Sequence, residues 1–300
     1  MPVSQNPARE LARYQHNYGY WGNCRRTGIV PGARRVPRSF RGNALLVASL
    51  LRVLSLTGTE LLPREFFARP AVRVAPDLLG CVLVHQTAEG LVAVRVTEVE
   101  AYAGESDPAS HAFHGRTARN AVMYGPPGYA YVYFTYGMHF CVNLVCQGEG
   151  DASAVLLRSG LVIDGAALAS ARRYGAAGGP GADGRAGVRQ SRARRTVPRE
   201  IDLARGPARL CEALAIDRAQ NGADACAPAS PLRVYAAQKA VPEADISTGP
   251  RVGVSRAADV AWRFWITGDP AVSVYRAYAP RRAGAKPVTT EGPEDGTISP

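Results

Sequence analysis

Hydrophobic and polar positions follow a strand-like pattern over much of the chain after residue 56. Short runs in which apolar residues alternate or cluster, bounded by Gly, Pro, Asn or Asp, are typical of β-strands. Helical spacing occurs in the segment PARLCEALAI, where Leu210, Ala213 and Leu214 share one face of a helix predicted over 207–216. The predicted strands cover residues 80–85, 91–102, 129–134, 139–146, 154–162, 260–267 and 272–275.

Three other segments have no sustained hydrophobic period. Residues 1–56 are punctuated by Arg, Gly and Pro and are expected to form a disordered basic extension. The Gly- and Arg-rich interval 175–195 is predicted to be a mobile surface loop, and residues 281–300 a frayed tail. The stretch between the two ends, residues 57–280, is expected to hold the folded domain.

Composition narrows the class of protein. The 300 residues are 46% hydrophobic and 20% charged, which is ordinary for a globular chain. The longest apolar run, 44–56, is broken by Arg52 and is shorter than the ~20 residues of a membrane helix, so we expect no membrane association. None of the six cysteines forms a CxxC pair, which favours reduced thiols in a cytoplasmic protein over a zinc or redox motif.

The positive charge is concentrated at one end of the chain. Residues 1–56 hold nine arginines and one glutamate, a net +8 of the total of +11, which leaves +3 for the other 244 residues. The extension is therefore expected to bind a polyanion such as DNA, and organelle targeting is a weaker alternative. Because Lys239 and Lys286 are the only lysines, the arginine excess is equally consistent with a GC-rich coding bias.

The segment LVAVRVTEVEAY carries the sharpest chemical signal. Strict alternation would place Glu98 and Glu100 on the same face as Val92, Val94 and Val96, so that two carboxylates end an apolar face. Burial and the neighbouring like charge should raise at least one of the two pKa values, as general acid–base catalysis requires. The alternative is that the strand has already reached solvent at residue 98.

The motif SHAFHG supplies His111 and His114 shortly after these glutamates. Together the four side chains could bind zinc or iron, but the histidines could equally be structural or contact a nucleobase. Since the motif lies between Pro108 and Gly115, no helix face would bring the rings together. We therefore expect no metal and no cofactor.

The stretch YAYVYFTYGMHFCVNLVC is the second chemical signal. Tyr129, Tyr131 and Tyr133 alternate onto one face of a strand, which sheet packing alone could also explain. Tyr136-Gly137 then follows as a predicted two-residue hairpin loop. An aromatic side chain at such a tip is expected to be exposed, where it could enter a base stack or a pocket of a partner protein.

These segments together resemble the alkyladenine (3-methyladenine) DNA glycosylase family, of the mammalian type that also has bacterial members. The resemblance covers about residues 57–280. It implies a single α+β domain built on a curved, mostly antiparallel sheet with flanking helices, and no metal. The motifs that carry it occur in the family's order: TEVEAYAGESDPASHAFHGRTARNAVMYGPPGYAYVYFTYGMHFCVNLVC, SAVLLRSG, RGPARLCEALAI and PRVGV.

The resemblance assigns catalytic roles residue by residue. Glu100 matches the general base that activates water, whereas Glu98 receives no role. Arg158 and the backbone carbonyl of Val252 match groups that help to hold that water.

It also implies a pocket for a base flipped out of the duplex. Tyr102, His111 and Tyr133 match the residues that sandwich and hydrogen-bond the base, and Asn143 matches the wall that screens its exocyclic groups. Tyr136, with Met138 beside it, matches the residue that fills the gap left in the DNA.

The expected function is that of a monomeric, monofunctional DNA glycosylase. Its substrate would be double-stranded DNA containing alkylated or deaminated purines, and its product an abasic site; such an enzyme would be cytoplasmic and associated with the nucleoid. Two alternatives belong to other classes. One is a non-catalytic architectural DNA-binding module that uses the Tyr136 hairpin, and the other is a metal-dependent hydrolase that uses Glu98, Glu100, His111 and His114.

Overall fold

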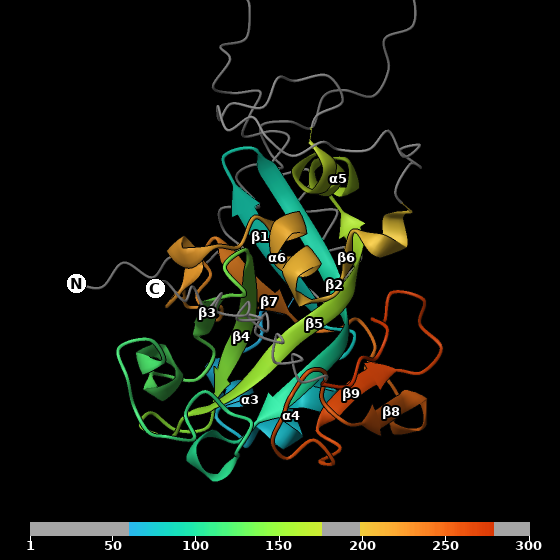
Figure 1. Cartoon of the computed structure of the whole chain (residues 1–300). Helices are drawn as coiled ribbons and strands as arrows, with labels where there is room; N and C mark the ends of the chain where they lie inside the picture. The colour runs from blue at the N-terminus through green and yellow to red at the C-terminus, as the bar shows by residue number, and fades with distance from the viewer. Residues whose placement is uncertain (1–59, 176–198, 279–300) are drawn as a thin grey trace, which may run out of the picture. The chain divides into compact units, whose positions relative to one another are not determined.

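The computed structural model describes residues 60–175 and 199–278 (Figure 1). Contacts divide the chain into Met1–Asn43 and Ala44–Pro300, and every described residue belongs to the second unit, which alone is discussed below. The expectations for residues 1–56, for the loop at 176–195 and for the tail at 281–300 lie outside the described residues.

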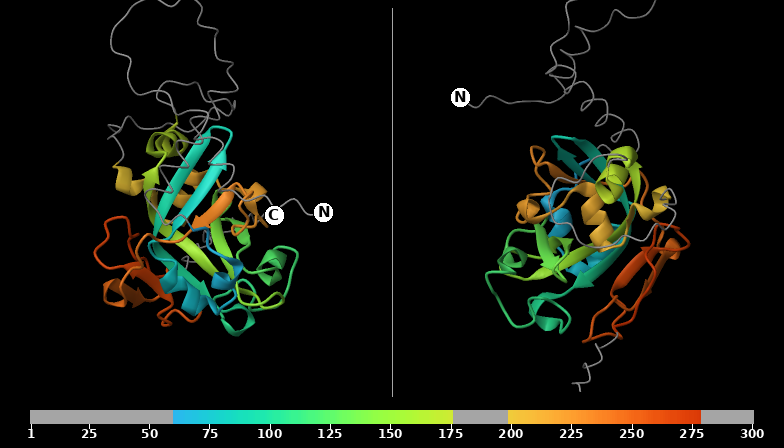
Figure 2. Two further views of the ribbon diagram at one scale, coloured as in Figure 1. Left: turned by 180° about the vertical axis from the view of Figure 1, so that it is seen from behind. Right: turned by 45° about the horizontal axis from the view of Figure 1, so that its top comes forward.

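The described residues form a nine-stranded antiparallel sheet. Its central path runs β3-β4-β5-β2-β1-β7, while β6 pairs with β5, β9 with β2, and β8 with β9. Figure 2, seen from behind, shows the long hairpin of β1 and β2 along this sheet. The predicted α+β class with a mostly antiparallel sheet is confirmed. The strands are β1 (Val82–Thr87), β2 (Gly90–Tyr102), β3 (Ala130–Thr135), β4 (His139–Cys146), β5 (Ser153–Asp164), β6 (Ala204–Arg205), β7 (Leu232–Tyr235), β8 (Ile246–Gly249) and β9 (Arg263–Ile266).

Four short helices flank the sheet in the part of the chain that the structure describes: α3 (Arg64–Phe67), α4 (Ala71–Asp77), α5 (Ala166–Tyr174) and α6 (Pro207–Leu214). The helix predicted over 207–216 is α6, which begins with Pro207 in its first turn and ends where Ala215 adopts a left-handed conformation at φ 53°. It packs against β4 and β5. The three other helices were not predicted.

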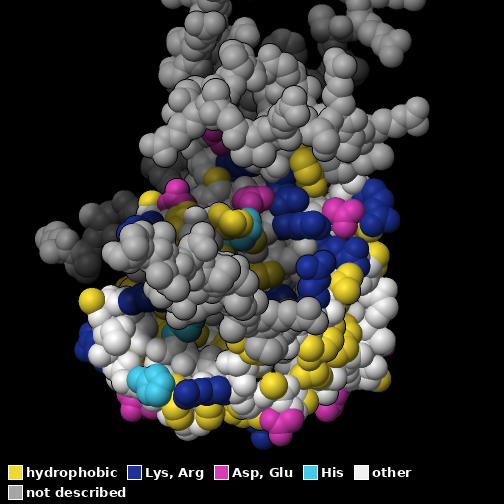
Figure 3. All heavy atoms as spheres, viewed as in Figure 1, with side chains coloured by type: hydrophobic (Ala, Val, Ile, Leu, Met, Phe, Trp, Pro, Cys, Tyr) yellow, Lys and Arg dark blue, Asp and Glu magenta, His cyan; other side chains and the backbone are white. Residues whose placement is uncertain are grey.

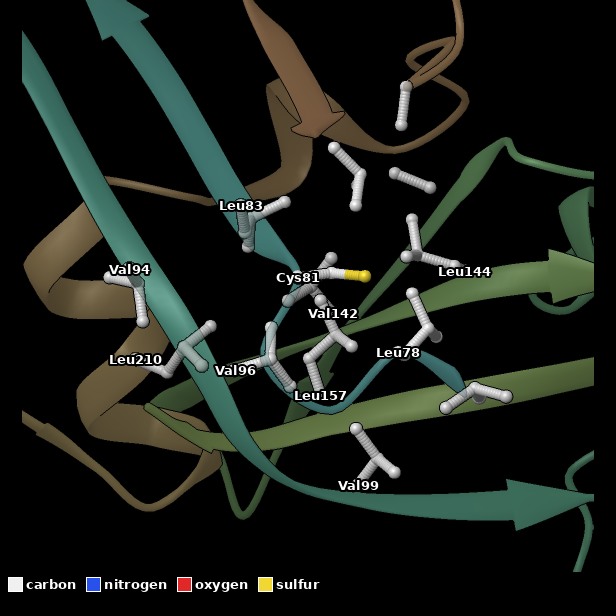
Figure 4. Packing of buried hydrophobic residues seen from close by; sticks show 14 of the residues in the cluster. Leu78, Cys81, Leu83, Val94, Val96, Val99, Val142, Leu144, Leu157 and Leu210 are labelled. Carbon is white, nitrogen blue, oxygen red and sulfur yellow. The ribbon is translucent and has the colours of Figure 1, made fainter. Parts of the chain in front are cut away.

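The main core lies between these helices and one face of the sheet. Figure 4 shows strand residues Val94, Val142 and Leu157 converging with Leu78, which follows α4, and Leu210 of α6. All five side chains are fully buried. Burial of this kind contributes about 1.5–3 kcal/mol for each large aliphatic side chain, so this cluster holds the sheet in place.

The pairing of β2 with β5 has three irregularities, one between Ala93 and Val94 and two compensating bulges on either side of Glu98. Val96 pairs with Gly160, Glu98 with Ser159 and Val99 with Leu157, so that Thr97 is an extra residue on β2 and Arg158 an extra residue on β5. At the same place the strand that pairs with the other edge of β2 changes from β1 to β9. The first half of β2 pairs with β1, and residues 98–100 pair with β9.

The bulge reverses which residues of β2 face the core. Val94 and Val96 belong to the core before it, and Val99 and Ala101 after it. Glu98 and Glu100 therefore point to the opposite face, and the prediction that they share a face with Val96 is wrong. The alternative that the strand has reached solvent is also wrong, because both glutamates are fully buried.

Other strand predictions hold with small differences in length, and β4 has the predicted bounds. The strand predicted over 272–275 is wrong. The N–H of Ser273 donates to a carboxylate oxygen of Glu98 and its carbonyl accepts from Arg263, so these backbone groups bind side chains instead of a strand. β6, β7 and β8 were not predicted. Among the described residues, the structure contains no helix with the length and apolar character needed to cross a bilayer.

Candidate active site

A pocket of about 540 Å³ opens on the face of β3, β4 and β5 that is turned away from the main core. The loop after β2 and the segment before β9 complete its walls, so residues far apart in sequence meet there. Of the residues to which the family resemblance gives a role, Met138 alone does not line it. Those that do are Glu100, Tyr102, His111, Tyr133, Tyr136, Asn143, Arg158 and Val252.

Glu100 presents a fully buried carboxylate to this pocket. Its Oε2 accepts a hydrogen bond from the Tyr102 hydroxyl at 2.8 Å, and its Oε1 accepts one from the backbone N–H of Val252 at 2.7 Å. Arg158 Nη1 lies 3.1 Å from the same Oε1. The carboxylate is therefore held in one orientation by two hydrogen bonds and one ion pair, which come from three parts of the chain. The role predicted for Val252 concerned its carbonyl, whereas the contact seen here is through its N–H.

Glu98 has a different environment although it lies only two residues away. Its Oε1 accepts from Arg158 Nε at 2.9 Å, from Arg263 Nε at 2.7 Å and from the Ser273 hydroxyl at 3.0 Å. Its Oε2 accepts from the backbone N–H of Ser273 at 2.8 Å. Burial by itself would raise the pKa of Glu98, but Arg158, Ser273 and Arg263 together lower it below its ordinary value. The expectation of a raised pKa is wrong for Glu98, and its oxygens are occupied by structural partners.

Arg158 connects the two carboxylates. Its Nε donates a hydrogen bond to Glu98, and its Nη1 forms an ion pair with Glu100. Arg158 is the extra residue of the β5 bulge, and from there its side chain reaches both carboxylates. Burial opposes the charged guanidinium, but the two carboxylates outweigh it and raise the pKa of Arg158. A permanent positive charge therefore lies beside Glu100 at the floor of the pocket.

Aromatic side chains form the walls, and Tyr131 and Tyr133 lie on one face of β3, as their alternation predicted. The rings of His111 and Tyr133 meet edge to face at 4.5 Å, and Tyr131 stacks on Tyr133 at 5.6 Å. The Tyr131 hydroxyl lies 3.1 Å from His111 Nδ1, and Asn143 donates through Nδ2 to the Tyr131 carbonyl at 3.1 Å. Partial burial in the pocket, followed by the nearby Arg119, lowers the pKa of His111 below its ordinary value.

The hairpin between β3 and β4 places Tyr136 at the rim of the pocket. Tyr136 is 80% exposed and Met138 is 68% exposed, as expected for side chains at a tip. The loop has three residues, 136–138, because Thr135 pairs with His139; the two-residue loop was a wrong prediction. Tyr136 and Gly137 both have left-handed φ values, 52° and 69°, which lets the chain reverse there. Met138 lines a second, smaller cavity at the end of α6.

Basic side chains lie around the pocket. The exposed Arg116, Arg119 and Arg256 stand over the rings of Tyr124, Tyr133 and Phe113. Sequence reasoning did not single them out, because isolated arginines in loops carry no pattern. Figure 3 shows further Lys and Arg side chains on the face where β5 and β6 end. Exposed guanidiniums around a recessed site suit a phosphate backbone.

The proposed metal ligands do not gather into one cluster. Within residues 60–175 and 199–278, no three His, Cys, Asp or Glu side chains are placed to hold a metal ion. The oxygens of Glu98 are taken by guanidinium and Ser273 donors, and His111 Nδ1 faces the Tyr131 hydroxyl. His114 is exposed and lines the pocket.

Comparison with known proteins agrees with this geometry. The family model described as methylpurine-DNA glycosylase matches residues 65–270. A protein of Streptomyces avermitilis is 54% identical over 74% of this chain and 94% of its own length. Proteins of Leifsonia xyli and Rhodopseudomonas palustris are 50% and 44% identical over 72% and 71% of this chain and 92% and 90% of theirs. All three bear the name "Putative 3-methyladenine DNA glycosylase". The resemblance stated from the motifs is thus confirmed, and the chain belongs to the methylpurine-DNA glycosylase family.

Proposed function

We propose that this glycosylase hydrolyses the N-glycosidic bond of alkylated or deaminated purines that are flipped out of double-stranded DNA, with water activated by Glu100. The observation that carries the proposal is a buried, oriented carboxylate at the floor of a pocket with aromatic walls. An enzyme that acts on a base within a duplex must extrude it, and therefore needs a pocket, a catalyst and a group that fills the gap.

Glu100 supplies the catalyst. It accepts one proton of a water molecule whose oxygen bonds to C1′, while the C1′–N bond breaks and its electron pair leaves with the purine. The hydrogen bonds from Tyr102 and Val252 and the ion pair with Arg158 hold the carboxylate for this step. The product is a free base and an abasic site, with the sugar–phosphate backbone intact.

The walls favour an electron-poor or cationic purine. Cation–π attraction to a face of Tyr133 or Tyr102 contributes about 0.5–2 kcal/mol, more when water is excluded. Because the pKa of His111 is lowered, its imidazole is neutral near pH 7 and does not repel a cationic base. Asn143, which is nearly fully buried and anchored on Tyr131, limits the room for exocyclic groups.

Tyr136 supplies the group that fills the gap. Its ring is exposed at the hairpin tip and also lines the pocket rim, so it can enter the base stack beside the place the flipped nucleotide occupies.

The test is release of free base from duplex oligonucleotides, each with one defined lesion, under single-turnover conditions in EDTA. We expect the wild type to release alkylated purines and Glu100→Gln to lose at least ~10²-fold in rate while it still binds lesion DNA. Glu105→Gln is the matched control, because Glu105 also accepts a tyrosine hydroxyl at 2.8 Å, from Tyr124, but does not line the pocket.

Each alternative predicts a different result in the same assay. Activity that EDTA abolishes would indicate the metal-dependent hydrolase. Binding without any release would indicate the architectural module. If Glu100→Gln keeps the normal rate while a folded Glu98→Gln does not, the base is Glu98.

A further inference from the structure

Arg251 is a buried cation that is held through its two Nη atoms, while its Nε is buried without a hydrogen-bond partner among the described residues. It is 1% exposed, and its Nη2 donates to Asp107 Oδ1 at 2.9 Å while Nη1 donates to Asp107 Oδ2. Nη1 also donates to the carbonyl of Ala101 at 3.0 Å. The guanidinium carbon lies 4.7 Å from the ring centre of Tyr102 and 5.3 Å from that of Trp262.

Asp107 organises the loop that follows β2. Its carboxylate accepts the backbone N–H of Ala103 at 3.3 Å and that of Ala109 at 3.0 Å, and it is itself 1% exposed. The ion pair with Arg251 therefore joins residues 103–109, which lead into His111, to residues 251–256, which form the facing wall of the pocket.

Arg251 is linked to both oxygens of the Glu100 carboxylate, through its chain neighbour Val252 and through the ring of Tyr102. The residue after Arg251 is Val252, whose N–H donates to Glu100 Oε1 at 2.7 Å. The ring on which Arg251 stacks is that of Tyr102, whose hydroxyl donates to Glu100 Oε2 at 2.8 Å. Each oxygen of the carboxylate thus has a donor that Arg251 fixes in place.

We propose that Asp107 and Arg251 are positioning residues, which orient the Glu100 carboxylate through the Val252 N–H and the Tyr102 hydroxyl. This inference rests on the proposed role of Glu100. A buried ion pair adds little to stability compared with apolar residues of the same size, because desolvation offsets the attraction. A pair placed here instead sets the angle at which a carboxylate oxygen meets water, and small errors in that angle reduce the rate strongly.

Asp107→Asn is the first test, because it keeps the shape of the side chain and removes its charge. We expect the single-turnover rate of base release to fall at least ~10-fold, while affinity for lesion DNA stays within ~3-fold. Asp224→Asn is the matched control. Asp224 also binds a guanidinium, that of Arg64 at 2.6 Å, and a backbone N–H two residues on, at 3.0 Å, but it does not line the pocket.

The split between rate and affinity separates positioning from a general loss of structure. A loosened pocket would weaken the binding of lesion DNA together with the rate, whereas a misoriented carboxylate lowers the rate alone.

A double-mutant cycle tests whether the effect acts through Glu100. Asp107→Asn should slow the wild type but cause no further loss in the Glu100→Gln background. If Asp107→Asn does not fold, Arg251→Lys keeps the buried charge and loses only the paired hydrogen bonds and the stacking, and the same rate loss is expected.

Several results would overturn the inference. A folded Asp107→Asn or Arg251→Lys with the wild-type rate would do so, as would additive losses in the cycle or an equal loss in Asp224→Asn. These outcomes differ from failure of the proposed function, in which Glu100→Gln itself remains active.

Discussion

Replacing Glu98 with Gln should destabilise the fold and leave the chemical step comparatively intact. Glu98 is fully buried and accepts from two guanidiniums, so the substitution leaves Arg263 without a carboxylate partner. Removing one partner of a buried pair costs about 3–5 kcal/mol. In a domain of this size, that corresponds to a loss of about 6–20 °C in Tm.

The pH dependence gives this prediction a second, independent readout. Because the folded state lowers the pKa of Glu98, its contribution to the free energy of unfolding is present above the ordinary value of 4.5 and is lost as pH falls through the folded value. The unfolding free energies of wild type and Glu98→Gln, measured by urea denaturation, should therefore differ most near pH 7 and converge toward acidic pH.

The control is Glu89→Gln. Glu89 forms a 3.1 Å ion pair with Arg172, but its side chain is 65% exposed, so the expected loss is about 0–1 kcal/mol. If Glu98→Gln unfolds like the wild type, or if its stability difference grows as pH falls, the structural assignment of Glu98 is incorrect.

Three further outcomes follow from the site and the sequence. Tyr136→Ala should weaken binding to an intact lesion pair more than binding to a pre-formed abasic site, since the wedge offsets part of the unstacking cost; equal losses would indicate ordinary packing. Deleting residues 1–56 should leave the single-turnover rate unchanged and reduce the slope of log affinity against log salt concentration. The reason is that a segment of charge +8 releases counterions from DNA when it binds. An identical slope would show that the segment does not contact DNA. Borohydride should trap no protein–DNA adduct, because a Schiff base needs an amine. Lys239 does not line the pocket, and Lys286 lies in the C-terminal tail. An adduct that is lost on replacing either lysine or on blocking the amino terminus would contradict a water nucleophile.

The parts of the site that lie on regular strands could be predicted from sequence. Alternation placed Tyr131 and Tyr133 on one face of β3, and the structure brings both into the pocket. β4 has the predicted bounds, and it carries Asn143 to the same wall. In these strands the pairing with neighbouring strands is regular, so side chains alternate between the two faces of the sheet. The sequence of the strand alone is therefore sufficient to tell which residues share a face.

The parts that depend on distant partners could not be predicted. The face of Glu98 is reversed by bulges that arise from the pairing of β2 with β5, some sixty residues later. Asp107 and Arg251 are 144 positions apart, and no spacing rule connects an aspartate in one loop with an arginine in another. Residues 272–275 have strand-like composition, but Ser273 is bound by Glu98 and Arg263 instead.

The paired bulges also determine which changes in chain length this fold can accept. Because Thr97 is the extra residue, deleting it would restore regular alternation, with Val96 still in the core and Glu98 and Glu100 still on the opposite face. One residue inserted between Glu98 and Val99 would instead exchange the two faces of the rest of β2. Val99 and Ala101 would leave the core, and Glu100 would enter it without Arg158. The exposed hairpin loop at 136–138, in contrast, can vary in length at little cost to folding. Homologous chains should accordingly show length differences at that loop and no insertion between residues 98 and 100.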